Sequence, residues 1–296
     1  MNKPRKIKWA IVLSILLLGL GQIYNGQWKK GILFLTILYT VPYFLVSLGL
    51  PSSLIGLIIF IVTLIILFLS PIIDSAVVAK KSKDYKLMWF NKPLYYIGLI
   101  VVVYSINYFL QDFSFISRYQ RFHVVVPNMY PSLRLNDSFI ADMNYYDNNT
   151  PKHGDLTVYK APYDTNTFVV GRIAGLSGDT IKFTDFNLFV NGIPEQMQYL
   201  EDGIVYEKYE TRIFESSLGN HKYKIALFKD EQDYGPPGNY SQNEPIKDDN
   251  YFILGDSRSD SYDSRNFGTV GIQSIAGRPL YYIFSDYKEK IGEVVE

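Results

Sequence analysis

The stretch from Val124 to Leu133, "VVVPNMYPSL", looks like a loop that should carry a nucleophile. It follows the last strongly apolar run of the chain and holds one hydroxyl, that of Ser132. A serine attacks a carbonyl only when a positioned base, about 3 Å away, accepts its proton. Ser132 stands directly after a proline, where a hydroxyl commonly stabilises a turn. We therefore expect Ser132 to be structural.

Metal, thiol and nucleic-acid chemistry are not indicated by the composition. The 296-residue chain has no cysteine, and His123, His153 and His221 are too far apart in sequence to show a ligand spacing. Lysine plus arginine equals aspartate plus glutamate, so the bulk charge favours no nucleic-acid partner. No metal and no cofactor are expected.

A series of motifs includes this loop. The patches occur in the order "PNMYPSL" (127–133), "HGDLTVY" (153–159), "VVGRIAGLSGD" (169–179), "LFVNG" (188–192) and "GDSRSDSYDSRNFG" (255–268). The last patch is the most specific, because it combines glycine, aspartate, serine and arginine in a fixed order within fourteen residues. The series, over about residues 115 to 285, resembles type I signal peptidases, which are membrane-anchored serine endopeptidases that process exported preproteins.

The resemblance implies a Ser–Lys dyad, in which a desolvated lysine of lowered pKa activates the serine. The position of the serine, before Met-x-Pro, is occupied by Asn128. The position of the lysine, directly before Arg172, is occupied by Gly171. Neither residue can serve as nucleophile or base, and the nearest lysines in sequence, Lys160 and Lys182, are eleven residues away. The catalytic positions are therefore expected to be degenerate.

Other positions of the family pattern are retained. The resemblance implies that they form the wall of the site or bind peptide, and that Ser261 corresponds to a serine that orients the lysine. Fold maintenance alone would also explain them. These positions are Met129, Pro131, Arg172, Asp179, Asp256, Arg258, Ser261, Asp263 and Arg265.

Residues 1–111 read as a multi-span helical membrane domain. A span needs about 20 apolar residues, and the segments 31–50, 54–79 and 94–110 meet this requirement. The segment 9–24 is shorter and is interrupted by glycines, in the stretch "GLGQIYNG", which we interpret as a turn or a close helix contact. Asp74 is expected to pair with Lys80 near the end of its span.

Basic clusters lie before segment 9–24, between this segment and 31–50, and between 54–79 and 94–110. If 9–24 is a re-entrant or short interfacial helix, all three clusters are cytoplasmic. We adopt this topology, which places residues 112–296 on the extracytoplasmic side of the cell membrane. A full span at 9–24 would instead separate the first two clusters.

Residues 112–296 predict an all-β domain of the signal-peptidase type. Runs such as "FHVVV", "SFIAD", "LTVYK" and "YFILGD" are β-branched or aromatic and alternate with turn signals. The range from about 195 to 250 is more charged and is expected to form an irregular insert, either a subdomain or long hairpins.

These features favour a non-cleaving pseudopeptidase that binds signal peptides or other preprotein segments at the membrane, with an active signal peptidase paralogue as a further possible partner. One alternative is an active signal peptidase with displaced catalytic groups, for which His123 is a candidate base. Another is a membrane scaffold or sensor whose β domain binds an external ligand.

Overall fold

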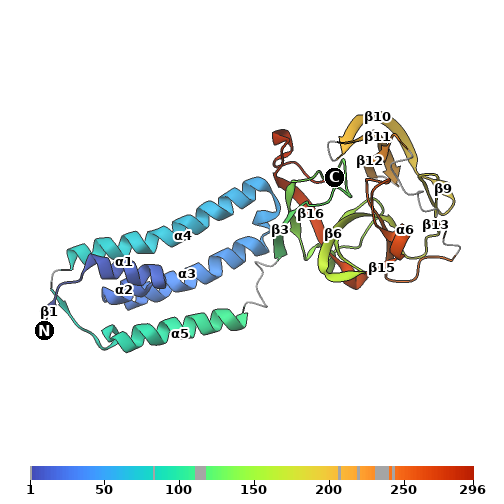
Figure 1. Ribbon diagram of the computed structural model, residues 1–296. Coiled ribbons are helices and arrows are strands. Elements are labelled where there is room, and N and C mark those ends of the chain that lie inside the picture. Colours follow the sequence, from blue (N-terminus) through green and yellow to red (C-terminus); the bar gives the residue numbers. More distant parts are fainter. Residues whose placement is uncertain are drawn as a thin grey trace. The chain divides into compact units, whose positions relative to one another are not determined.

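The computed structural model describes residues 2–82, 84–110, 118–205, 208–218, 221–230, 240–241 and 244–296. The chain divides into two compact units, Met1–Ser117 and Arg118–Glu296. The first is helical and the second is built of strands (Figure 1).

In the described residues of the first unit there are three long helices and two short ones. Among the described residues, α3 and α4 are long and apolar enough to cross a membrane, and the described part of α5 is a shorter apolar helix. The apolar side chains of α4 face outward; Ile55, for example, is 74% exposed. The helices are α1 (Ile7–Leu16), α2 (Leu20–Tyr24), α3 (Trp28–Ser47), α4 (Leu54–Lys81) and α5 (Pro93–Leu110), with the short elements β1 (Asn2–Lys3), η1 (Leu50–Ser52), β2 (Tyr85–Lys86) and η2 (Trp89–Asn91).

The break between α1 and α2 falls at Gly19, whose φ of 96° suits glycine far better than other residues. A Cβ on Gly19 would overlap the carbonyl oxygen of Gly31, so the glycine also permits close packing against α3. After the break, α2 returns toward the start of α1. The Lys6 N–H, just before α1, donates to the hydroxyl of Tyr24, at the end of α2, at 3.1 Å. Segment 7–24 is thus a helical hairpin within this unit.

Asp74 pairs with Lys30, at 2.5 Å, and accepts a second hydrogen bond from Gln22, at 3.1 Å. The expected pairing with Lys80 is not the one formed. Six residues along an α-helix amount to about 600° of rotation, so the two side chains leave α4 in different directions. The sequence gives their separation but not the approach of α2 and α3.

The second unit is organised around a seven-stranded antiparallel sheet in the order β15-β14-β6-β5-β16-β4-β3. A four-stranded sheet, β13-β7-β8-β9, adjoins it in the chain. The strands of the large sheet are β3 (Tyr119–His123), β4 (Ser138–Asp142), β5 (Leu156–Ala161), β6 (Asp164–Gly175), β14 (Asn250–Leu254), β15 (Val270–Gly271) and β16 (Ile275–Phe284); those of the smaller are β7 (Ile181–Thr184), β8 (Asn187–Val190), β9 (Ile193–Pro194) and β13 (Tyr240–Ser241).

The range expected to form an irregular insert contains a three-stranded antiparallel sheet, β10 (Gln196–Val205), β11 (Tyr209–Leu218) and β12 (His221–Phe228). Its first strand is exposed along most of its length, whereas buried and exposed positions alternate along part of the second. Water-facing strands carry many charged residues, which masks the strand pattern in the sequence.

Candidate functional site

The loop Val124–Leu133 connects β3 to β4 and is closed at its base by backbone hydrogen bonds. The N–H of Val124 donates to Asp137 O at 2.8 Å, and that of Asn136 donates to Val124 O at 3.0 Å. Within the loop, the Tyr130–Pro131 peptide bond is cis. Met129 is completely buried, so the middle of the loop is part of the hydrophobic core.

Asn128 joins this loop to two other segments. Its side-chain Nδ2 donates to the carbonyl oxygen of Val170 in β6 at 2.8 Å. Its own backbone carbonyl accepts the N–H of Ser257 at 3.1 Å. The position expected to be degenerate therefore lies at the junction of the loop, β6 and the segment that follows β14.

Gly171 lies one residue further along β6, and its surroundings leave no room for a side chain. A Cβ there would overlap Cγ2 of Ile253 and would lie 3.1 Å from Cε1 of Tyr159. Ile253 is fully buried and Tyr159 is 2% exposed, so neither can move aside easily. The space beside Gly171 is filled by the hydrophobic core, which the sequence did not indicate.

A groove of about 340 Å³ adjoins Asn128. Its walls are mainly apolar and come from β3, the loop, β6 and the segment near Tyr262. Such a concave, largely apolar surface with a few polar groups is typical of binding sites. The lining residues are Phe122, His123, Val124, Val125, Val126, Asn128, Met129, Leu133, Phe139, Tyr163, Thr167, Phe168, Val169, Val170, Asp260 and Tyr262.

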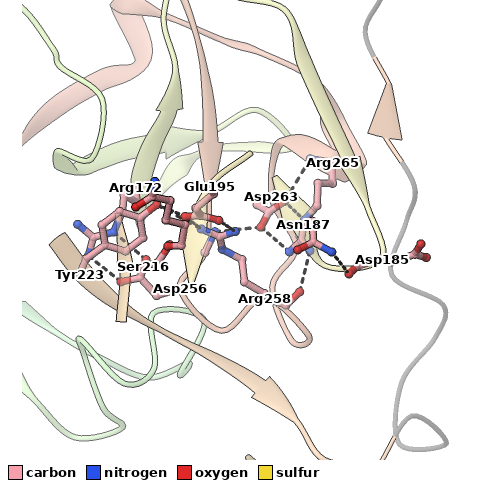
Figure 2. Close-up of polar contacts among 12 residues, drawn as sticks. Arg172, Asp185, Asn187, Glu195, Ser216, Tyr223, Asp256, Arg258, Asp263 and Arg265 are labelled. Atoms are coloured by element: carbon pink, nitrogen blue, oxygen red, sulfur yellow. Dashed lines mark hydrogen bonds and ion pairs between the residues drawn. The ribbon is translucent and has the colours of Figure 1, made fainter. Parts of the chain in front are cut away.

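Arg172 and Asp256 form a buried, bidentate ion pair beside the loop, with distances of 2.8 and 2.7 Å (Figure 2). Although burial would lower the pKa of Arg172, the Asp256 carboxylate raises it above its usual value. Ser132 donates to Asp256 Oδ2 at 2.6 Å and is 8% exposed. Its hydroxyl thus completes an ion pair, consistent with a structural role.

Arg258 forms a second buried pair, with Glu195 in the turn before β10, at 2.8 and 2.9 Å (Figure 2). Burial would raise the pKa of Glu195, but the Arg258 guanidinium holds it below its usual value. Tyr223 donates its hydroxyl to the same carboxylate in a short hydrogen bond. Glu195 was not anticipated, because an isolated acidic residue 63 positions from its partner gives no signal in a single sequence.

Asp263 caps α6 (Ser264–Phe267), accepts the N–H of Gly255 at 2.9 Å, and pairs with Arg265 at 2.7 and 2.8 Å. Arg265 also donates to the carbonyl of Arg258 at 2.7 Å. Ser261 Oγ is buried and has no hydrogen-bond partner among the described residues. A Cβ on Gly255 would overlap that oxygen, so this glycine permits the close approach of the segment to the loop.

Asp179 lies in a separate cluster. It accepts hydrogen bonds from the N–H of Leu176 at 2.8 Å and from Asn191 at 2.7 Å, and lies 2.6 Å from His153 Nε2. Burial would raise the pKa of Asp179, but these hydrogen bonds hold it below its usual value. It stabilises the turn after β6 and does not line the groove.

Other candidate bases take different positions. His123 Nδ1 lies 3.1 Å from Ser138 Oγ across β3 and β4, but Ser138 is completely buried. The ammonium groups of Lys160 and Lys182 lie over the rings of Phe168 and Phe189, each at 5.9 Å. Within the described part of the chain, no group of three or more histidine and acidic residues could hold a metal ion.

Comparison with protein families matches residues 93–284 to the family described as "Signal peptidase, peptidase S26". This range includes the loop, positions 128 and 171, and the ion-pair residues of the β unit described above.

Individual relatives carry related names. Signal peptidase I of Leptolyngbya laminosa is 26% identical over 160 residues, which are 52% of this chain and 63% of that protein. Signal peptidase I of Rickettsia bellii (strain OSU 85-389) is 29% identical over 148 residues, 46% of this chain and 48% of the relative. Thylakoidal processing peptidase 1, chloroplastic, of Arabidopsis thaliana is 26% identical over 164 residues, 52% of this chain and 38% of that protein. The chain thus spans less than two thirds of these relatives.

Among solved structures, the crystal structure of a signal peptidase I from Enterococcus faecalis V583 matches 44% of this chain and 97% of that chain. The TM-score is 0.27 and the sequence identity is 24%.

Proposed function

Because the chain belongs to the signal peptidase, peptidase S26, family, we propose that it is a non-cleaving member of that family. In this proposal it binds signal peptides or similar extended segments of exported proteins in the groove beside Asn128. The motif that places the chain in the family is retained around two positions that lack catalytic side chains, Asn128 and Gly171.

The observation that carries the proposal is the packing around Gly171. A lysine at this position would need the space that Ile253 and Tyr159 occupy. Position 171 has no lysine to act as the base. In addition, core side chains fill the space that such a lysine would occupy. An amide at position 128 cannot replace a serine hydroxyl in acyl transfer. Loss of a nucleophile or base in a comparable serine protease lowers turnover by about 10⁶-fold.

Retained peptide binding is supported by the groove itself. β14 pairs with β6 from Arg172 to Gly175, so this pairing ends before the stretch of β6 from Phe168 to Val170, which lines the groove. An extended peptide can add to such a strand edge through main-chain hydrogen bonds, while side-chain pockets select its sequence. Binding therefore does not require the catalytic groups.

The same proposal places the β unit on the extracytoplasmic side of a membrane that α3, α4 and α5 cross, with the hairpin of α1 and α2 entering and leaving on the cytoplasmic side. The basic residues that flank the helices support this orientation. A reporter enzyme fused after residue 296 should be active outside the cytoplasm. Activity in the cytoplasm alone would reverse the topology.

The decisive experiment is a cleavage assay with the full chain in detergent and a purified preprotein. The natural protein and Asn128→Ser should both be inactive, because neither has a base. Asn128→Ser with Gly171→Lys should also be inactive or very weak, since Ile253 blocks the lysine. Adding Ile253→Ala should produce cleavage, and Asn128→Ala with the same two changes is the matched control that should not cleave.

Robust cleavage by the natural protein would refute the proposal and favour displaced catalytic groups. His123 and Ser138 are the hydroxyl–imidazole pair that such an enzyme could use, at 3.1 Å. In that case Ser138→Ala should abolish cleavage. We favour the non-cleaving function because Ser138 is completely buried and cannot reach a peptide bond in the groove.

A further inference from the structure

Asn128 lines the groove and carries a hydrogen-bond acceptor, at the position where the peptidases of this family would present a nucleophile. Its amide has a donor end and an acceptor end. The donor end, Nδ2, is bound to Val170 O at 2.8 Å. The acceptor end, Oδ1, has no hydrogen-bond partner in the described part of the chain and is not among its buried, unpaired atoms.

The orientation of this amide is fixed by its partner. A backbone carbonyl oxygen accepts hydrogen bonds and cannot donate them. Rotating the amide by 180° would place Oδ1 against Val170 O, so that two acceptors would face each other. The bond to Val170 therefore directs Oδ1 away from β6, and Asn128 lines the groove.

The backbone that carries Asn128 is also held. Its carbonyl accepts the Ser257 N–H at 3.1 Å, and Tyr130 N–H donates to Pro127 O at 2.9 Å across the residue. The next residue, Met129, is completely buried. A group fixed in this way loses little conformational entropy when a ligand binds to it.

We propose that Asn128 Oδ1 accepts a backbone N–H from an extended peptide bound in the groove. This inference rests on the proposed function, and it identifies the group that reads the peptide backbone. Three observations favour a peptide N–H: Asn128 lines the groove and its Oδ1 has no partner among the described residues, the groove runs along β6 residues 168–170, and its remaining walls are mainly apolar. An apolar ligand without a donor would leave Oδ1 desolvated and unpaired, which is unfavourable.

The test is a double-mutant cycle on the full-length protein in detergent. The probes are one fluorescent synthetic peptide with the sequence of a signal-peptide cleavage region, and copies of it N-methylated at one backbone nitrogen each. N-methylation removes a single donor. Binding is measured by fluorescence anisotropy with the natural protein and with Asn128→Ala.

Asn128→Ala should weaken binding of the unmodified peptide about five- to tenfold, as expected for one hydrogen bond in a partly buried site. One N-methylated peptide should lose a similar factor with the natural protein and nothing further with Asn128→Ala. This non-additivity identifies the N–H that Asn128 binds.

Asn149→Ala is the matched control variant, because Asn149 Nδ2 also donates to a backbone carbonyl, that of Tyr145, at 2.8 Å, but outside the groove. It should bind every peptide like the natural protein. If the peptides bind but every N-methylation has the same effect with and without Asn128, the inference is wrong and the proposed function stands. If no peptide binds to the natural protein, the proposed function fails and the inference fails with it.

Discussion

Within the β unit, the groove and the neighbouring ion pairs differ in how firmly their side chains are held. Val125 and Tyr262, on the wall of the groove, are 72% and 58% exposed. Arg258 and Glu195 are 1% and 0% exposed at their side chains. Part of the groove wall is thus made of exposed side chains, whereas these ion-pair side chains are fully enclosed.

This difference distinguishes residues that stabilise the fold from residues that could bind or react with a ligand. Removing one member of a buried ion pair leaves an unpaired charge in the interior, which strongly destabilises a fold. Replacing a side chain at the edge of a groove alters binding or catalysis at much smaller cost in stability. The retained pattern of Asp256, Arg258, Asp263 and Arg265 is therefore compatible with loss of activity. The following predictions test this separation.

The largest effect is expected for Arg258→Met, which leaves the Glu195 carboxylate buried without its partner. We expect a loss of about 3–5 kcal/mol in the free energy of unfolding. Urea unfolding of the full chain in detergent measures it. Lys222→Met is the matched control, because it breaks an ion pair with Glu215 whose side chains are 71% and 36% exposed, and should cost at most about 1 kcal/mol.

Gly171→Ala should cost about 1–3 kcal/mol, because the added methyl group overlaps Ile253 and overpacks the core. Combining it with Ile253→Ala should cost less than the sum of the two single changes, because the second change makes room for the first. Strict additivity in urea unfolding would show that the space beside Gly171 is not the reason for its glycine.

Acid should weaken the fold through Glu195. Its folded-state pKa is below the ordinary value of 4.5, so its contribution to stability is present above about pH 4.5 and is lost as the pH falls through the folded pKa. One proton changes the slope by at most about 1.4 kcal/mol per pH unit. As the pH is lowered from 6 to 3, the midpoint temperature of thermal unfolding should therefore fall more steeply for the natural protein than for Glu195→Gln. Equal slopes would contradict the lowered pKa.

The smallest effect among the buried residues is expected for Ser132→Ala. Asp256 keeps both hydrogen bonds from Arg172, so the loss should be about 1 kcal/mol, the value of one hydrogen bond. Urea unfolding measures this loss, and peptide binding should be unchanged. A loss of 3 kcal/mol or more would place Ser132 among the essential members of the ion-pair cluster.

The sequence predicted more of the β unit than of its contacts. Strand runs and turn signals placed most strands, since alternation and turn residues are local properties. The motifs located Arg172 and Asp256, which do form a pair. The partner of Arg258 could not be predicted, because Glu195 reaches it only through the packing of the turn before β10 against the segment after β14.

The groove and the helical unit illustrate the same limit. Phe122, Tyr163 and Tyr262 meet around the groove although they are far apart in sequence. Asp74 forms its ion pair with Lys30 of another helix and not with a lysine of its own helix. Ile253 blocks the space beside Gly171 through the register between β6 and β14. Each of these facts depends on three-dimensional packing, which a pattern in one sequence does not encode.

The hydrogen bond from Ser257 N–H to the carbonyl of Asn128 has a consequence for how this family can diversify. It involves only main-chain atoms, so it does not depend on which side chain stands at position 128. The side chain at position 128 can therefore change while this main-chain contact between the loop and the segment after β14 remains. A change at position 128 is thereby separated from the backbone of the loop, whereas a side chain at position 171 needs the space that Ile253 fills.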